Sequence, residues 1–260
     1  MTTQELSNAF DTMVNSYGVT ASFGEQSSSR NLVFDEYEKS LFLTQAQEEL
    51  TISLYTGKNS YGESFESTEE VREYLKPLIR NAHKDIALVD NMDAAKAIIR
   101  YGDCKVYRAS LGENILGIIY EEVTFDDPSL GCKDGTTVPV IPVRHDEIAH
   151  ILKNPFRGVS SRRVLRVDNQ DNGNKMELLS EYSLEPKSYY IRYIIKPLPI
   201  ILTDLGDSVT IEGSSNESLK INDDNNLWLP RQLHNRILEM AVRKAIQSRG
   251  YSLQTENKDN

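Results

Sequence analysis

The stretch from Lys187 to Leu202 constrains the fold of this chain more than any other. Between positions 189 and 195 the side chains alternate in two sets rich in tyrosine and isoleucine, a period of two that is typical of a β-strand with one apolar face. Pro197 and Pro199 follow, and because each lacks an N–H they predict a sheet edge or a bend. One set is predicted to be more buried than the other: Tyr189, Ile191, Tyr193 and Ile195 against Tyr190, Arg192, Ile194 and Lys196.

Amphipathic helices are predicted towards both ends of the chain, over residues 4–17, 34–56, 67–82 and 230–249. The strongest is the second, because Asp35 and Glu38 form an acidic capping box and Gly57 suits the left-handed C-cap. Pro77 is expected to kink or shorten the third helix. In the last helix a proline lies near the first turn, and Gly250 is expected to cap the end.

Extended segments dominate the middle of the chain. They are predicted at 86–90, 104–110, 115–125, 138–143, 162–168, 176–182, 208–212 and 218–221, with short helices at 92–101 and 145–154. The prolines in 138–143 predict an edge strand there. The strand that starts near Lys187 is expected to join the hairpin formed by 162–168 and 176–182 as its third strand.

These elements predict an α+β fold. Its expected parts are a helical N-terminal part (1–85), a mostly antiparallel β part (86–229), a C-terminal helix packing on the helical part (230–250), and a polar tail (251–260).

Composition and the sequence of the first residues argue against several classes of protein. The 260 residues carry a net charge of −10, which disfavours a general nucleic-acid coat. The two cysteines, Cys104 and Cys132, are isolated in sequence and fit a reducing compartment better than a disulfide. The first residues lack the pattern of a signal peptide, and no apolar run suits a membrane helix, so a cytoplasmic origin is expected.

No catalytic, metal or cofactor pattern is complete. His145 and His150 lie five positions apart, whereas a zinc-protease helix needs four. The segment from Asp168 to Gly173 resembles a calcium loop, but the twelfth position is Leu179 where a bidentate glutamate is required. Phosphate-binding loops and nucleophile elbows are absent. The sequence therefore predicts that the protein is not an enzyme and that it binds no cofactor.

The residues that suggest binding are basic or aromatic. One basic segment stands out in the acidic chain, consisting of Lys153, Arg157, Arg162, Arg163 and Arg166. It fits a docking patch for an acidic surface or contact with a DNA backbone, and equally a solvated rim paired with acids of the same chain. The aromatic candidates for an interface, with Arg192 beside them, are Tyr189, Tyr190, Tyr193 and Trp228, and a place in the core suits the tyrosines as well.

Several stretches, taken in order, resemble a ring protein of the head-to-tail connector of crAss-like tailed phages. These stretches are Asp35–Leu50, Val138–Val143, Lys153–Arg157, Tyr189–Leu202 and Leu233–Ala245. The resemblance implies a structural virion subunit, assembled in the host cytoplasm into a ring of twelve copies below the portal. It also implies contacts with the portal and with neighbouring ring or tail proteins, and passage of DNA without sequence-specific binding.

A ring needs two different, complementary patches on each subunit, and the basic segment is a candidate for one of them. Reversing the charges of Arg162 and Arg163 is therefore expected to abolish ring assembly or portal docking. Two other hypotheses remain open at this point. One is another virion role, such as a tail hub component or an assembly chaperone, and the other is a hydrolase without a recognised motif.

Overall fold

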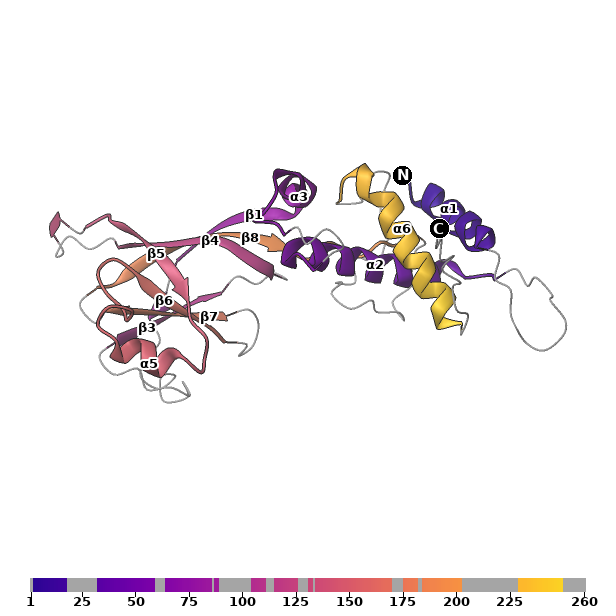
Figure 1. The fold of residues 1–260 in the computed structure, drawn as a ribbon. Coiled ribbons are helices and arrows are strands. Elements are labelled where there is room, and N and C mark those ends of the chain that lie inside the picture. The colour runs from indigo at the N-terminus through magenta and orange to yellow at the C-terminus, as the bar shows by residue number, and fades with distance from the viewer. Residues whose placement is uncertain are drawn as a thin grey trace. The chain divides into compact units, whose positions relative to one another are not determined.

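The computed structural model describes residues 2–17, 32–58, 64–85, 87–88, 104–110, 115–125, 131–132, 134–169, 175–181, 184–202 and 229–249. It divides the chain into two compact units (Figure 1). The helical unit comprises residues 1–78 and 196–260, and the β unit comprises residues 79–195. The chain therefore passes between the units twice, whereas the sequence suggested boundaries at 85/86 and 229/230. Several predicted features lie outside the described residues: 92–101, 208–212, 218–221, Trp228, Gly250 and the tail.

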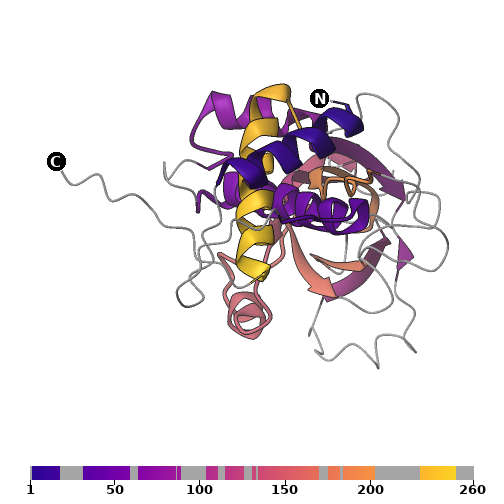
Figure 2. The ribbon, with the colours of Figure 1, turned by 90° about the vertical axis from the view of Figure 1, so that its right-hand side faces the viewer.

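The long helices of the helical unit pack together: α1 (Thr3–Ser16), α2 (Glu36–Thr56) and α6 (Arg231–Ser248). The C-terminal helix α6 packs across α2 and also contacts α1 (Figures 1 and 2). Phe34 links these helices, since its ring meets Phe10 and Phe42 edge to face at 5.7 and 6.0 Å between centroids. Arg249 and Lys244 bind Glu38 and Glu49 across the α2–α6 contact, at 2.7 and 2.6 Å. The predicted packing of the C-terminal helix is confirmed.

The predicted ends of α2 are also confirmed. The carboxylate of Asp35 accepts a hydrogen bond from the Glu38 backbone N–H at 2.6 Å, and Glu38 accepts one in return. Gly57 closes the helix with φ 75°, and a Cβ there would lie 3.0 Å from the Cβ of Ser64. The next helix, α3 (Glu69–Leu75), is shorter than predicted because a 3-10 turn, η1 (Lys76–Leu78), begins beside Pro77.

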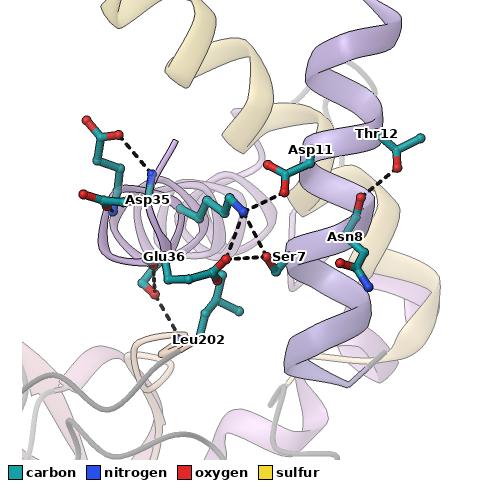
Figure 3. Close-up of polar contacts among 10 residues, drawn as sticks. Ser7, Asn8, Asp11, Thr12, Asp35, Glu36 and Leu202 are labelled. Atoms are coloured by element: carbon teal, nitrogen blue, oxygen red, sulfur yellow. Dashed lines mark hydrogen bonds and ion pairs between the residues drawn. The ribbon is translucent and has the colours of Figure 1, made fainter. Parts of the chain in front are cut away.

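A buried lysine joins α1 to α2. The Lys39 ammonium donates to Asp11, Glu36 and Ser7 at 2.8, 3.0 and 3.0 Å, and the Ser7 hydroxyl donates to Glu36 (Figure 3). Burial alone would lower the pKa of Lys39, but the two carboxylates outweigh it and the pKa is raised. The cation is therefore held in its charged form at the contact between the two helices.

Polar side chains on α2 bind an extended segment, residues 196–202. The Leu202 N–H donates to the Ser40 hydroxyl and the Ile200 N–H donates to the Thr44 hydroxyl, both at 3.0 Å. The Gln47 amide donates to the carbonyl of Leu198 at 2.8 Å. These side chains occur at spacings of four and three, so they form one stripe on the helix. Each binds one residue of the segment, and the three bound residues alternate along it. All three are buried.

In the described part of the β unit, eight strands form one curled sheet, in the order β1-β8-β4-β5-β6-β7-β3-β2. They are β1 (Ile79–Asp85), β2 (Ala87–Leu88), β3 (Cys104–Ser110), β4 (Ile115–Phe125), β5 (Thr137–Pro142), β6 (Val164–Asn169), β7 (Lys175–Glu181) and β8 (Pro186–Ile195). Every pairing is antiparallel except that of β5 with β6. The predicted α+β class is confirmed.

Two predictions about strand positions are wrong. β5 is not an edge strand, because it lies between β4 and β6. It pairs with each neighbour over three residues only, so the missing N–H groups of Pro139 and Pro142 each fall at the end of a ladder. β8 does not extend the β6–β7 hairpin. It pairs with β1 and β4, and β3 takes the place beside β7.

The sheet encloses one apolar core, and it curls far enough for β1 to contact β3. Side chains from both halves meet inside, among them Tyr107, Phe125, Leu178 and Tyr189. On the outer side of β6, β7 and β3 the short helix α5 (Ile148–Lys153) covers a second cluster that includes Leu165 and Leu179 (Figure 1). α5 begins three residues later than the predicted helix at 145–154.

The predicted two faces of β8 are largely confirmed. Tyr189, Ile191 and Tyr193 are buried in the core, whereas Tyr190 is half-buried and Arg192 is exposed. The alternation fails at the end of the strand, where Ile194 is buried and Ile195 is only partly buried. The register of β8 against β4 also shifts there, between Ile115 and Gly117, and a shift of this kind changes which face a side chain occupies.

Candidate interaction surfaces

The predicted basic residues do not form a single patch. Lys153, Arg157 and Arg162 lie exposed on the connection between α5 and β6, which we call the basic loop (residues 153–163). The loop carries four cations and no acid, in a chain of net charge −10. At its outermost part Phe156 is 84% exposed. The basic loop is therefore a cationic surface with an exposed aromatic ring.

Hydrogen bonds fix the shape of the basic loop. The Arg163 guanidinium is half-buried and donates to the carbonyls of Gly158, at 2.8 Å, and Phe156. The side chain of Asn154 accepts from the Phe156 N–H at 2.9 Å, and its carbonyl accepts from the Gly158 N–H at 2.8 Å. Arg163 thus holds the loop together, and its own charge is not presented at the surface as those of Arg157 and Arg162 are.

Gly158 suits the close approach of the loop to α5. A Cβ at this position would lie 3.1 Å from the carbonyl oxygen of Asn154 and 3.3 Å from that of Ile151. A side chain at this position would require the loop or the end of the helix to shift by a few tenths of an ångström. The exposed ring of Phe156 is consequently presented by an anchored turn.

Arg166 lies apart from the other basic residues, inside the curled sheet. Its guanidinium is 3.5 Å from Glu121 Oε1, and Tyr189 donates to the other oxygen of Glu121 at 2.8 Å. The side chains of Arg166 and Glu121 are each 7% exposed. Nε of Arg166 lies 3.2 Å from the exposed Asp168, outside hydrogen-bond geometry. Arg166 therefore belongs to the core of the β unit.

Burial sets the protonation of this inner ionic cluster. It raises the pKa of the Glu121 carboxyl, and Arg166 and the Tyr189 hydroxyl offset part of the rise. Burial and the neighbouring carboxylate also raise the pKa of Tyr189, so its hydroxyl remains the donor. Arg166 on β6 and Tyr189 on β8 both contact the buried carboxylate of Glu121 on β4, so the cluster connects the two halves of the sheet.

A second exposed surface is the outer side of β1, β8 and β4, which we call the tyrosine face. Its outward side chains are Asn81, His83, Tyr120, Glu122, Tyr190 and Arg192. The Tyr120 ring packs against Tyr190 at 6.4 Å between centroids, and its hydroxyl donates to Glu122 at 2.6 Å. Arg192 donates to the side chain of Asn81 at 3.0 Å. Tyr120 remains 48% exposed.

The structure thus distributes the predicted interface residues over several places. Tyr190 and Arg192 share the tyrosine face, Arg166 lies in the core with Tyr189 and Tyr193, and Trp228 lies outside the described residues. Phe156 and Tyr120 are exposed aromatics that sequence reasoning did not single out. The cations on either side of Phe156 in the sequence could have predicted that its ring is exposed. The exposure of Tyr120 could not be predicted in this way, because it depends on a register shift between β4 and β8.

Other sites are not supported in the part of the chain that the structure describes. His145 and Asp168 line a shallow, open depression beside Pro142, but no group of three metal-ligating side chains was found among the described residues. Among the described helices, none combines the length and apolar character needed to cross a membrane. Among the described residues, neither Cys104 nor Cys132 forms a disulfide.

Comparison with known proteins gives a consistent result. A family model described as phage tail ring protein 3/4 matches residues 1–258. A protein named ring protein 3, from Bacteroides phage crAss001, is 38% identical over 250 residues, which is 96% of each chain. A protein of the same phage named ring protein 4/5 is 26% identical over 250 residues, 94% of this chain and 92% of the relative. The similarity covers both structural units.

Proposed function

The chain belongs to the phage tail ring protein 3/4 family of crAss-like phages, and on this premise we propose that its ring lies in the head-to-tail connector, below the portal, and forms part of the channel through which DNA leaves the capsid. As a member of that family it is a structural protein of the virion that forms a ring in the tail, and it is not an enzyme. The observation that carries the proposal is the family match over residues 1–258.

The charge of the chain supports a role around DNA. The chain carries a net charge of −10, and a channel wall lined by its acidic side chains would repel the phosphate backbone and let the DNA slide. DNA would then pass without sequence-specific contacts. The proposed protein partners are the portal and neighbouring ring or tail proteins, with twelve copies in the ring and assembly in the host cytoplasm.

Stoichiometry in purified particles tests this proposal. Quantitative mass spectrometry with labelled peptides of this chain and of the portal protein would measure the ratio of the two. A ratio of one is expected when two twelve-fold rings are stacked. Absence of the chain from mature particles would identify it as an assembly factor, and a ratio that differs from one would contradict the twelve-fold ring below the portal.

A further inference from the structure

The basic loop and the tyrosine face lie on opposite sides of the β unit. Both halves of the curled sheet point their inner side chains into one core, so the outer sides of the halves face away from each other. α5, which leads into the basic loop, covers the outer side of β6, β7 and β3. β1, β8 and β4, which form the tyrosine face, lie across the unit from it (Figure 1).

This arrangement meets the geometric requirement of a ring. A cyclic assembly with one interface type joins two different patches, one on each side of every subunit. We infer that the basic loop of one copy docks on the tyrosine face of the next copy, with Phe156 against Tyr120 and Tyr190. The inference rests on the proposed ring function and specifies which surfaces of the chain meet.

The chemistry of the two surfaces is complementary. Phe156 offers an exposed ring to an exposed tyrosine pair, and aromatic pairs stabilise interfaces beyond the area they bury. The cations Arg157 and Arg162 would meet the carboxylate of Glu122, which accepts from Tyr120, and the faces of the tyrosine rings, which attract guanidinium groups. Arg192 of the same face donates to Asn81, so the contact depends on the rings and on Glu122 and not on an excess of acids there. The hydrogen bonds of Arg163 hold the loop in place before contact, so little conformational entropy is lost on docking.

A protein partner explains the basic loop better than DNA does. A ring of such loops facing the channel would place several cations per subunit against the phosphates and retain the DNA. The 84% exposed ring of Phe156, held outward by bonds on both of its backbone groups, is a feature of protein contacts. Because the chain as a whole is acidic, another copy of it is a suitable surface for the loop's positive charge.

Cysteine cross-linking in purified particles tests the contact. Phages would carry Phe156→Cys and Tyr120→Cys together in a background without Cys104 and Cys132 (Cys104→Ala, Cys132→Ser), and would be treated with a short bismaleimide. Head-to-tail docking predicts a ladder of cross-linked chains, and neither single variant should give one. A matched control combines Phe156→Cys with Val33→Cys, since Val33 is 81% exposed but lies in the helical unit.

Outcomes separate this inference from the proposed function. If the chain is present in particles but gives no ladder, the proposed contact between the basic loop and the tyrosine face is wrong, and the proposed ring function still stands. If in addition the Phe156→Cys thiol stays reactive in intact particles, the loop faces open solvent or the DNA channel. If cross-links join the thiol to another tail protein, that protein is the partner. Absence of the chain from particles would instead overturn the proposed function.

A substitution series gives a second measurement. Phe156→Ala and Arg157→Glu are each expected to weaken association between copies by about tenfold or more, as loss of an interface anchor does. Because both side chains are exposed, the melting temperature should not change. Val33→Ala removes an equally exposed apolar side chain and should not weaken association. Equal incorporation of all three variants into particles would overturn the inference.

Discussion

At the scale of single residues, the β unit depends most on the inner ionic cluster. Arg166 and Tyr189 both serve the carboxylate of Glu121, and all three side chains are buried in the core. Removing one partner of a buried ion pair leaves the other charge without compensation, which is far less favourable than losing an exposed pair. The cluster should therefore respond to substitution much more strongly than the surface pairs of the same unit.

Arg166→Met is predicted to destabilise the protein by about 3–5 kcal/mol, because Glu121 would stay buried without its cation. Urea denaturation followed by circular dichroism measures the change. Arg144→Met is the matched control, since Arg144 and Asp146 are 74% and 64% exposed, and its effect should be within about 0.5 kcal/mol. Equal stability of the two variants would show that the cluster is not structural.

Two buried tyrosines in the same core are predicted to respond in opposite directions. Tyr189 donates to Glu121, so Tyr189→Phe should destabilise the protein by about 1–3 kcal/mol. The hydroxyl of Tyr107 is buried and has no hydrogen-bond partner among the described residues, so Tyr107→Phe should be neutral or stabilise by up to about 1 kcal/mol. Denaturation at neutral pH tests both, and a stability loss of equal size in the two variants would contradict the difference.

The same two phenols predict how stability depends on pH. Burial raises the pKa of Tyr107 and of Tyr189 above the ordinary value. The unfolded chain therefore releases these protons first, so their contribution is complete below about pH 10 and is lost as the pH rises further. Tyr107→Phe should make the alkaline loss of stability shallower. An unchanged slope in denaturation experiments between neutral and alkaline pH would contradict this cause.

At the scale of elements, local signals predicted the helices and most strands, whereas long-range pairing was not predictable. The capping box of Asp35 and the period of β8 depend on neighbours in the sequence, and both were identified. The place of β5 depends on its separate pairings with β4 and β6. The polar stripe of α2 binds a segment about 150 positions away in the sequence. Arg166 shows the same limit, because its place in the core follows from the sheet and not from the adjacent arginines.

The polar stripe of α2 gives a prediction at this scale. Thr44→Val keeps the shape of the side chain but leaves the buried N–H of Ile200 without an acceptor, so it should destabilise the protein by about 1–3 kcal/mol. Thr56→Val, at the exposed end of the same helix, should change the stability by no more than about 0.5 kcal/mol. Urea titrations of the two variants measure both. Similar values would mean that the contact of residues 196–202 with α2 contributes little.

At the scale of the whole molecule, the β unit is an insertion within the helical unit. The chain crosses between the units at 78/79 and 195/196, and Ile79 is paired with Ile194 on adjacent strands. Both crossings therefore leave the sheet side by side, with paired residues about 5 Å apart. A short linker can replace an inserted unit when its ends are this close.

The helical unit should therefore fold without the β unit. A variant that joins Leu78 to Lys196 through a short glycine linker is predicted to unfold cooperatively on heating, with the circular dichroism of a helical protein. A control that also lacks residues 196–202 should lose stability, because the stripe on α2 would have no partner. Gradual melting of the first variant would show that the units depend on each other.

A three-dimensional reconstruction of the intact particle tests the proposed function most directly. It should show twelve copies of the chain in a closed ring below the portal, coaxial with it, with DNA in the bore and the basic loop of each copy against the tyrosine face of the next. A ring elsewhere in the tail, or one that does not surround the DNA, would contradict the proposed place of this protein in the connector.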